Sequence, residues 1–203
     1  MNRSKPDHRP STRRDSAATK ARLLDAASAE FAAYGLAGAR VDRIAEAANA
    51  NKQRIYAYFG NKEQLFDAVI DRVLAVGAET VPFDAEDLPG VAGQIFDNLV
   101  AHPDLMRLLS WKLLERPGAT DQEAATYTAK TTAVAAAQEQ GRVEPELGPE
   151  DLVAFVLALT QAWFSLTGGM SPTSGSDPWS TRRLARHRDA VVDAVRRITT
   201  PHR

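Results

Sequence analysis

The chain has 203 residues, 44% of them hydrophobic, which is enough for one large domain or two small ones with a buried core. It contains no cysteine, and this excludes a disulfide framework and thiol chemistry. The net charge is −1 but unevenly placed, since residues 1–62 hold 12 Lys and Arg against 6 Asp and Glu, whereas residues 63–203 hold 13 against 20. A basic N-terminal part followed by an acidic remainder is typical of a protein that binds nucleic acid with its N-terminal part. A chance asymmetry of solvated faces gives the same counts.

Residues 1–16 are predicted to form a basic flexible arm, because they contain five arginines and lysines and almost nothing apolar. Arg13 and Arg14 lie nearest the first predicted helix, so they are the candidates for phosphate or minor-groove contacts. A solvated tail without a binding role explains the composition equally well.

A first helix is predicted over residues 17–34, and Gly35 is expected to end it as a left-handed cap. Its buried stripe would consist of Leu24, Ala27, Phe31 and Tyr34. A second, shorter helix follows, since Val41, Ile44, Ala45 and Ala48 share one face of a helix. Asn49 comes next and tolerates the left-handed backbone of a sharp turn.

The third helix is predicted to begin with Asn51 as its N-cap. Ile55 and Phe59 are four residues apart and can pack inward, which leaves Lys52, Gln53 and Arg54 on the outer face near the helix start. Arginine and lysine pair with guanine in the major groove, and glutamine pairs with adenine. The pattern therefore predicts a short helix that enters a DNA major groove, although a generic helical hairpin with a solvated basic face remains the alternative.

A fourth helix is predicted from Asn61, which forms a capping box with Gln64 three residues later. Lys62, at the start of this helix, is a candidate phosphate clamp. Tyr56 and Tyr58 are predicted to hold phosphates through their hydroxyls.

Residues 41–62, VDRIAEAANANKQRIYAYFGNK, resemble the TetR family of bacterial transcriptional regulators. The sequence departs from the family pattern at three positions, where Asn49 replaces a glycine, Asn51 a serine and Arg40 a threonine. The change to Arg40 removes a helix N-cap but adds a positive charge that can pair with a DNA phosphate. The resemblance implies a three-helix DNA-binding domain over residues 17–62 and a helical effector-binding and dimerisation domain over residues 63–203. The positions that match are Val41, Ile44, Ala45, Ala48, Tyr56, Tyr58, Phe59 and Lys62.

After a linker rich in proline and acidic residues at 81–90, helices are predicted over residues 91–101, 103–114, 121–140 and 150–166, and a last one ends near residue 198. No strand-like alternation appears, so the fold class is predicted to be all-α with about nine helices.

The helix over residues 150–166 is apolar nearly all round, so it must be covered on every side. We predict a four-helix interface in which the last two helices of each subunit form a homodimer, and the family resemblance implies the same arrangement. A monomeric core completed by these helices is the alternative. The predicted interface residues are Phe164, Leu184, Val191 and Val195.

The resemblance also implies an effector cavity in the C-terminal domain, lined by aromatic and apolar side chains. For each candidate taken singly, core packing is the more common role. The candidates are Phe96, Met106, Leu109, Trp111, Tyr127 and Trp163.

Enzyme chemistry has little support, because the four histidines are scattered without metal spacing and no nucleophile elbow or phosphate-binding loop is present. We predict a ligand-responsive repressor that binds a palindromic operator as a homodimer, with double-stranded DNA and a small-molecule effector as partners and without cofactor, metal or membrane. A cytoplasmic location is expected, since no secretory signal or spanning segment is seen. The alternatives are an all-α small-molecule-binding protein without a DNA role and a helical enzyme.

Overall fold

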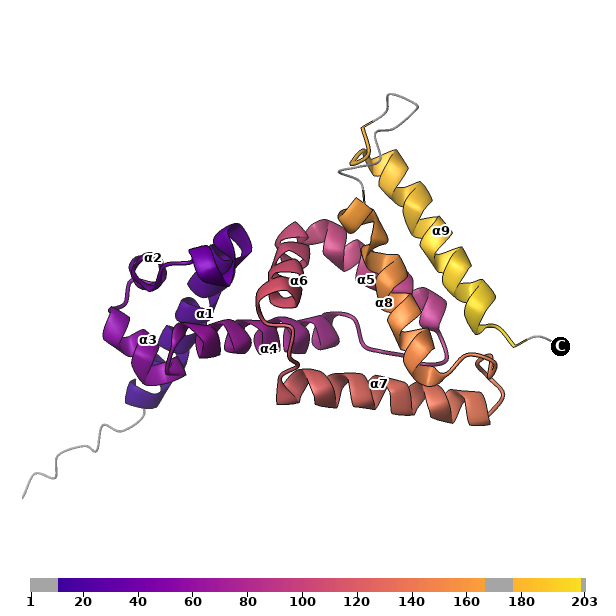
Figure 1. Cartoon of the computed structure of the whole chain (residues 1–203), viewed down its shortest axis with the longest axis horizontal. Helices are drawn as coiled ribbons and strands as arrows, with labels where there is room; N and C mark the ends of the chain where they lie inside the picture. Colours follow the sequence, from indigo (N-terminus) through magenta and orange to yellow (C-terminus); the bar gives the residue numbers. More distant parts are fainter. Residues whose placement is uncertain (1–10, 167–176, 202–203) are drawn as a thin grey trace, which may run out of the picture. The chain divides into compact units, whose positions relative to one another are not determined.

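The computed structural model describes residues 11–166 and 177–201, except for the side chains of residues 11–15. Within these ranges the chain forms nine α-helices and no strand, which confirms the all-α prediction (Figure 1). None of these helices has the length and hydropathy needed to cross a membrane. The helices are α1 (Ser11–Gly38), α2 (Val41–Ala47), α3 (Lys52–Phe59), α4 (Lys62–Thr80), α5 (Leu88–Ala101), α6 (Pro103–Glu115), α7 (Asp121–Glu139), α8 (Pro149–Leu166) and α9 (Thr181–Thr199).

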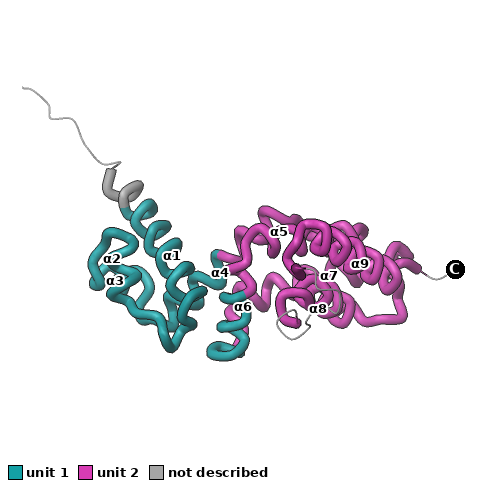
Figure 2. The backbone as a smooth tube through the Cα atoms, turned by 90° about the horizontal axis from the view of Figure 1, so that it is seen from above, with its two compact units in different colours: residues 1–72, 107–117 teal, residues 73–106, 118–203 magenta. Residues whose placement is uncertain are grey.

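The chain divides into two compact units, coloured separately in Figure 2. Unit 1 runs up to Arg72 and includes Arg107–Pro117, whereas unit 2 consists of Val73–Met106 and the chain from Gly118 onward. The sequence placed the division at residue 62. Unit 1 extends further because Leu65, Phe66, Val69 and Ile70 of α4 are buried in its core and because Arg116 pairs with Asp67.

Helix α1 starts earlier than predicted, at Ser11, so residues 11–16 are helical and do not belong to an arm. The rest of the predicted arm, residues 1–10, lies outside the described residues. The buried stripe is Leu23, Ala27 and Phe31, all 0% exposed. Tyr34, predicted to be buried, is 51% exposed, and the guanidinium of Arg43 lies 4.2 Å from its ring centroid.

Gly35 interrupts α1 with φ 68° and ψ −178°, so the predicted positive φ is confirmed although the chain resumes helical form through Gly38. A side chain here would also meet the ring of Trp111, which lies 2.8 Å from where a Cβ would stand. The break frees the N–H groups of Leu36 and Ala37, and both donate to the carboxylate of Glu115. Only glycine satisfies both the backbone angle and this close approach.

Short polar side chains define the ends of α2, α3 and α4, as predicted. Asn49 has φ 48° in the turn between α2 and α3. Asn51 caps α3, because its Oδ1 accepts from the N–H of Arg54 at 2.9 Å. Asn61 and Gln64 form the predicted capping box, with reciprocal bonds of 2.7 and 3.1 Å. These local bonds fix the residues at which α3 and α4 begin.

Unit 2 is built around α5 and α8, since α5 packs against α8 and α9, and α7 packs against α8. Its core includes Leu88, Val134, Leu152 and Val156. Val191 and Val195, predicted at a subunit interface, are 3% and 0% exposed and belong to this same core. Helical periodicity identified the apolar side of α9 but not what covers it, and here α5 and α8 do.

Candidate nucleic-acid interface

Helix α3 separates an apolar inner face from a polar outer face. Ile55 is 0% and Phe59 8% exposed, so both point into the core of unit 1. Lys52, Gln53 and Arg54 are exposed and occupy the first turn of the helix. The N-terminus of a helix carries partial positive charge and free N–H groups, which favour an approaching phosphate. This face therefore has the side chains and the electrostatics that DNA reading requires.

Lys52 is not free on this face, because Asp42 of α2 lies beside it. Its Nζ is 3.0 Å from a carboxylate oxygen of Asp42, and 44% of the lysine side chain and 74% of the aspartate side chain are exposed. The hydrogen bond to Asp42 raises the pKa of Lys52. An exposed pair of this kind is screened by solvent and contributes little, so DNA can displace it. Asp42 thus competes with a phosphate or base for the ammonium group.

Removing this competitor should strengthen DNA binding. We expect Asp42→Asn to tighten binding to operator and random DNA alike by a few-fold, and to steepen the dependence on salt by about one counterion. Fluorescence-anisotropy titrations at several salt concentrations measure both quantities. Asp25→Asn, which removes the same charge from a pair with Arg72 on α4, is the matched control. An equal gain in the control would attribute the effect to net charge alone.

The carboxylate of Glu30 in α1 accepts hydrogen bonds from two arginines at the start of α2. Arg40 is the N-cap of α2 and makes no side-chain cap bond, but its N–H donates to Oε1 of Glu30 at 2.8 Å. The same oxygen accepts from Nε of Arg43 at 2.7 Å. Burial raises the pKa of Glu30, but the hydrogen bonds from Arg43 and Arg40 outweigh it and the pKa is lowered. The Arg40 side chain is left exposed, as a phosphate contact requires.

Among the predicted phosphate contacts, Tyr56 is 44% exposed, whereas Tyr58 and Lys62 have partners inside unit 1. The hydroxyl of Tyr58 lies 3.0 Å from Oγ of Ser16. Nζ of Lys62 donates to the carbonyl oxygens of Ala37 and Ala39, each at 3.4 Å. Lys62 therefore neutralises the carbonyl end of α1, as cations often do at helix C-termini. Arg13 and Arg14 lie in the first turn of α1, with side chains outside the description.

The predicted effector residues are divided between the two units. Leu109 and Trp111 belong to the part of α6 in unit 1, and Trp111 packs on Gly35. The other four belong to unit 2, where Phe96, Met106 and Trp163 are at most 9% exposed and Tyr127 is 42% exposed.

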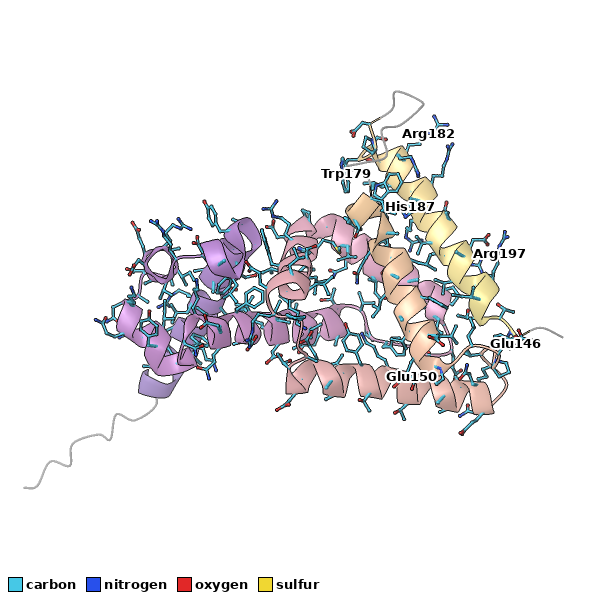
Figure 3. The ribbon with its side chains drawn as sticks, in the orientation of Figure 1. Glu146, Glu150, Trp179, Arg182, His187 and Arg197 are labelled. Carbon is cyan, nitrogen blue, oxygen red and sulfur yellow. The ribbon has the colours of Figure 1, made fainter. Side chains whose placement is uncertain are left out.

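Two of these aromatic residues meet His187, which the sequence did not single out. The ring of His187 lies 4.6 Å from that of Trp163 and 5.5 Å from that of Phe96. Figure 3 shows His187 and Trp179 where the end of α8 approaches α9. Burial lowers the pKa of His187, as does Arg183, and its Nε2 is buried without a hydrogen-bond partner in the described chain. Only the pairing of α5, α8 and α9 brings these rings together.

Within the ranges described, no three His, Asp or Glu side chains are grouped as metal ligands would be. The predicted interface residues Phe164 and Leu184 are half-buried in unit 2. Two other apolar residues of α8, Phe155 and Leu166, are more exposed than these two, at 44% and 55%.

Comparison with known proteins assigns both parts of the chain. Residues 23–69 match the family profile described as bacterial regulatory proteins of the tetR family, and residues 87–197 match the profile described as a tetracyclin repressor-like C-terminal domain. The chain is 40% identical over 191 residues to the HTH-type transcriptional repressor SCO4008 of Streptomyces coelicolor, covering 91% of this chain and 97% of that protein.

Solved structures agree with this assignment. The putative transcriptional regulator SCO4942 of Streptomyces coelicolor has a TM-score of 0.76 at 36% identity and covers 89% of this chain and 98% of that one. NalD of Pseudomonas aeruginosa, a secondary repressor of a multidrug efflux pump, has a TM-score of 0.60 at 19% identity, covering 92% of this chain and 98% of that one. The similarity to NalD shows the fold alone.

Proposed function

This chain belongs to the TetR family of bacterial DNA-binding transcriptional regulators, and we propose that it is a repressor that binds a palindromic operator as a homodimer and leaves it when an effector binds. The observation that carries this proposal is the outer face of α3, where Arg54 stands exposed in the first turn above a fully buried Ile55. The name of SCO4008 supports the repressor assignment, because the similarity extends over nearly the whole of both chains.

A single α3 contacts too few base pairs to select one operator, so we infer that two protomers bind together. A two-fold dimer presents its two reading helices to half-sites about 34–36 Å apart, one turn of DNA. Such a dimer accounts for a palindromic operator, because each half-site meets the same protein surface. Arg54 and Gln53 are the residues we assign to base edges, and Tyr56 and Arg40 to phosphates.

We place the dimer contact on the outer face of α8, in place of Val191 and Val195. One side of this helix lies in the core of unit 2, with Leu152 and Val156 at most 1% exposed. Its other side exposes Phe155 and Leu166 together with two alanines at positions 154 and 158. Large apolar side chains separated by small ones suit close packing of two helices.

Helix α6 is the element through which we expect an effector to act, because its part from Arg107 onward is tied to α1 and α4 within unit 1. Nε of Arg107 donates to the carbonyl of Ala32 at 2.8 Å. Glu115 accepts the N–H groups freed at the Gly35 break, and Arg116 forms a two-point pair with Asp67. A shift of α6 must therefore disturb the α1 break. The effector must bind the two arrangements with different affinity to change the DNA-binding population.

Dimerisation and operator binding can be tested together. We expect the protein to enrich a palindromic sequence from random DNA and to protect it with two protomers per site. Phe155→Asp should shift the protein to monomer in sedimentation and weaken operator binding strongly, since a charge would be buried without a partner. Leu113→Asp, at a residue of α6 that is 71% exposed, is the control. Wild-type monomers at micromolar concentration, or a failure to enrich any sequence, would rule out the proposal.

A further inference from the structure

Lys130 of α7 stands at an unusual position for a lysine. The inward face of α7 is marked by Val134 and Ala137, which are 0% and 4% exposed in the core of unit 2. Counting back along the same face by helical spacing gives Lys130 and then Tyr127. Lys130 is half-buried, and no other lysine occurs in unit 2. The core face of α7 therefore carries an ammonium group where an apolar residue is expected.

The surroundings of Lys130 are aromatic and do not balance its charge. Nζ lies 5.7 Å from the ring centroid of Phe83 and 5.8 Å from that of Tyr127. Lys130 has no ion pair or hydrogen bond within the part of the chain that the structure describes. Glu123, the acidic residue two turns earlier on this face, is engaged in the capping box with Thr120.

Aromatic contacts alone do not explain a lysine here. Both rings lie near the outer limit of about 6 Å for a cation–π interaction, where the attraction only partly replaces the hydration that a half-buried ammonium loses. Burial lowers the pKa of Lys130, as expected for a cation without a counter-charge. The anionic group of a ligand beside Nζ would supply that counter-charge. The rings of Phe83 and Tyr127 would then pack against the apolar part of the same ligand.

We propose that Lys130 is the anchor of the effector site and that the effector is an organic carboxylate, with its acid group on Nζ and its apolar body against Phe83 and Tyr127. This assignment rests on the proposed function for the existence of an effector but derives the effector's chemistry from the residues around Lys130. All three residues belong to unit 2.

The probes are acids paired with their neutral amides: 4-phenylbutyrate with 4-phenylbutyramide, and octanoate with octanamide. Calorimetric titration of the full chain should show the acids binding wild type at least about tenfold more tightly than the amides, as a charge-assisted hydrogen bond implies. Lys130→Met, which keeps the apolar stem, should abolish this preference, and Lys130→Arg should retain it. The control Arg142→Met removes a cation of unit 2 that is exposed and paired with Glu86, so it should behave as wild type.

A second measurement needs no ligand. The melting temperature of unliganded Lys130→Met should equal or exceed that of wild type, because an apolar group replaces a desolvated ammonium. A clear fall would make Lys130 a structural residue and overturn the assignment. Acids that bind no better than amides, or an unchanged preference in Lys130→Met, would overturn it as well. Operator binding without ligand is measured separately, so the repressor proposal survives or fails on its own result.

Discussion

Replacing Arg54 by alanine is expected to weaken binding to the cognate operator by about 1–3 kcal/mol, roughly tenfold to more than a hundredfold, and to relax the preference at one base pair. Its side chain is exposed in the first turn of α3, and its backbone N–H is fixed by the Asn51 cap. Unlike Lys52, which pairs with Asp42, its guanidinium makes no hydrogen bond or ion pair with any residue the structure describes. Arg54 can therefore form a two-point contact with a guanine without first breaking a protein contact.

The measurement is a titration of Arg54→Ala on operator, on operators changed one base pair at a time, and on scrambled DNA. Lys62→Ala serves as the contrasting variant. Nζ of Lys62 bonds to the carbonyls of Ala37 and Ala39, so this lysine adds positive charge to the DNA-binding unit but is not assigned to a base. We expect Lys62→Ala to weaken operator and scrambled DNA alike and to lower the salt slope by no more than about one counterion. If Arg54→Ala weakens all DNAs equally, Arg54 holds a phosphate and does not read a base.

The parts of the interface that the sequence predicted well are those set by neighbouring residues. The left-handed backbone at Asn49, the cap at Asn51 and the capping box from Asn61 to Gln64 each depend on bonds that span three residues or fewer. Such bonds form wherever the chain places a short polar side chain before a helical segment, so the sequence is sufficient to predict them. The inward direction of Ile55 and Phe59 follows in the same way from helical spacing.

Features that depend on how helices cross were not predictable in this way. Asp42 and Lys52 are ten residues apart on different helices, and only the α2–α3 crossing brings them together. Helical spacing placed Val191 on the apolar side of α9. It did not show that this side packs against helices of the same unit and not against a second subunit. The break at Gly35 was predicted, yet its partner Trp111 was assigned to an effector pocket, because nothing local connects α6 to α1.

The core of unit 1 provides the largest effect we expect on stability. Phe31 is 0% exposed, and its ring meets that of Phe66 edge to face at 5.0 Å between centroids. Phe31→Ala should lower the free energy of unfolding of this unit by about 3–5 kcal/mol, through lost burial and the cavity that remains. That is a large share of the roughly 5–15 kcal/mol that holds a domain folded. Hydrogen exchange of α1 amides, compared with that of α8 amides, locates the loss.

Tyr34→Ala is the matched test, because the sequence placed Tyr34 on the same buried stripe as Phe31 and the structure does not. Tyr34 is 51% exposed and its ring contacts the guanidinium of Arg43, so the change should cost much less than Phe31→Ala. The difference between the two variants measures the orientation of α1 directly. Equal losses would mean that Tyr34 is buried as the periodicity predicted, and the α1 side of the DNA-binding unit would need a different packing. A loss confined to Phe31→Ala means that the buried face of α1 runs through Leu23, Ala27 and Phe31, and that Tyr34 lies beside this face on the exposed side of the helix.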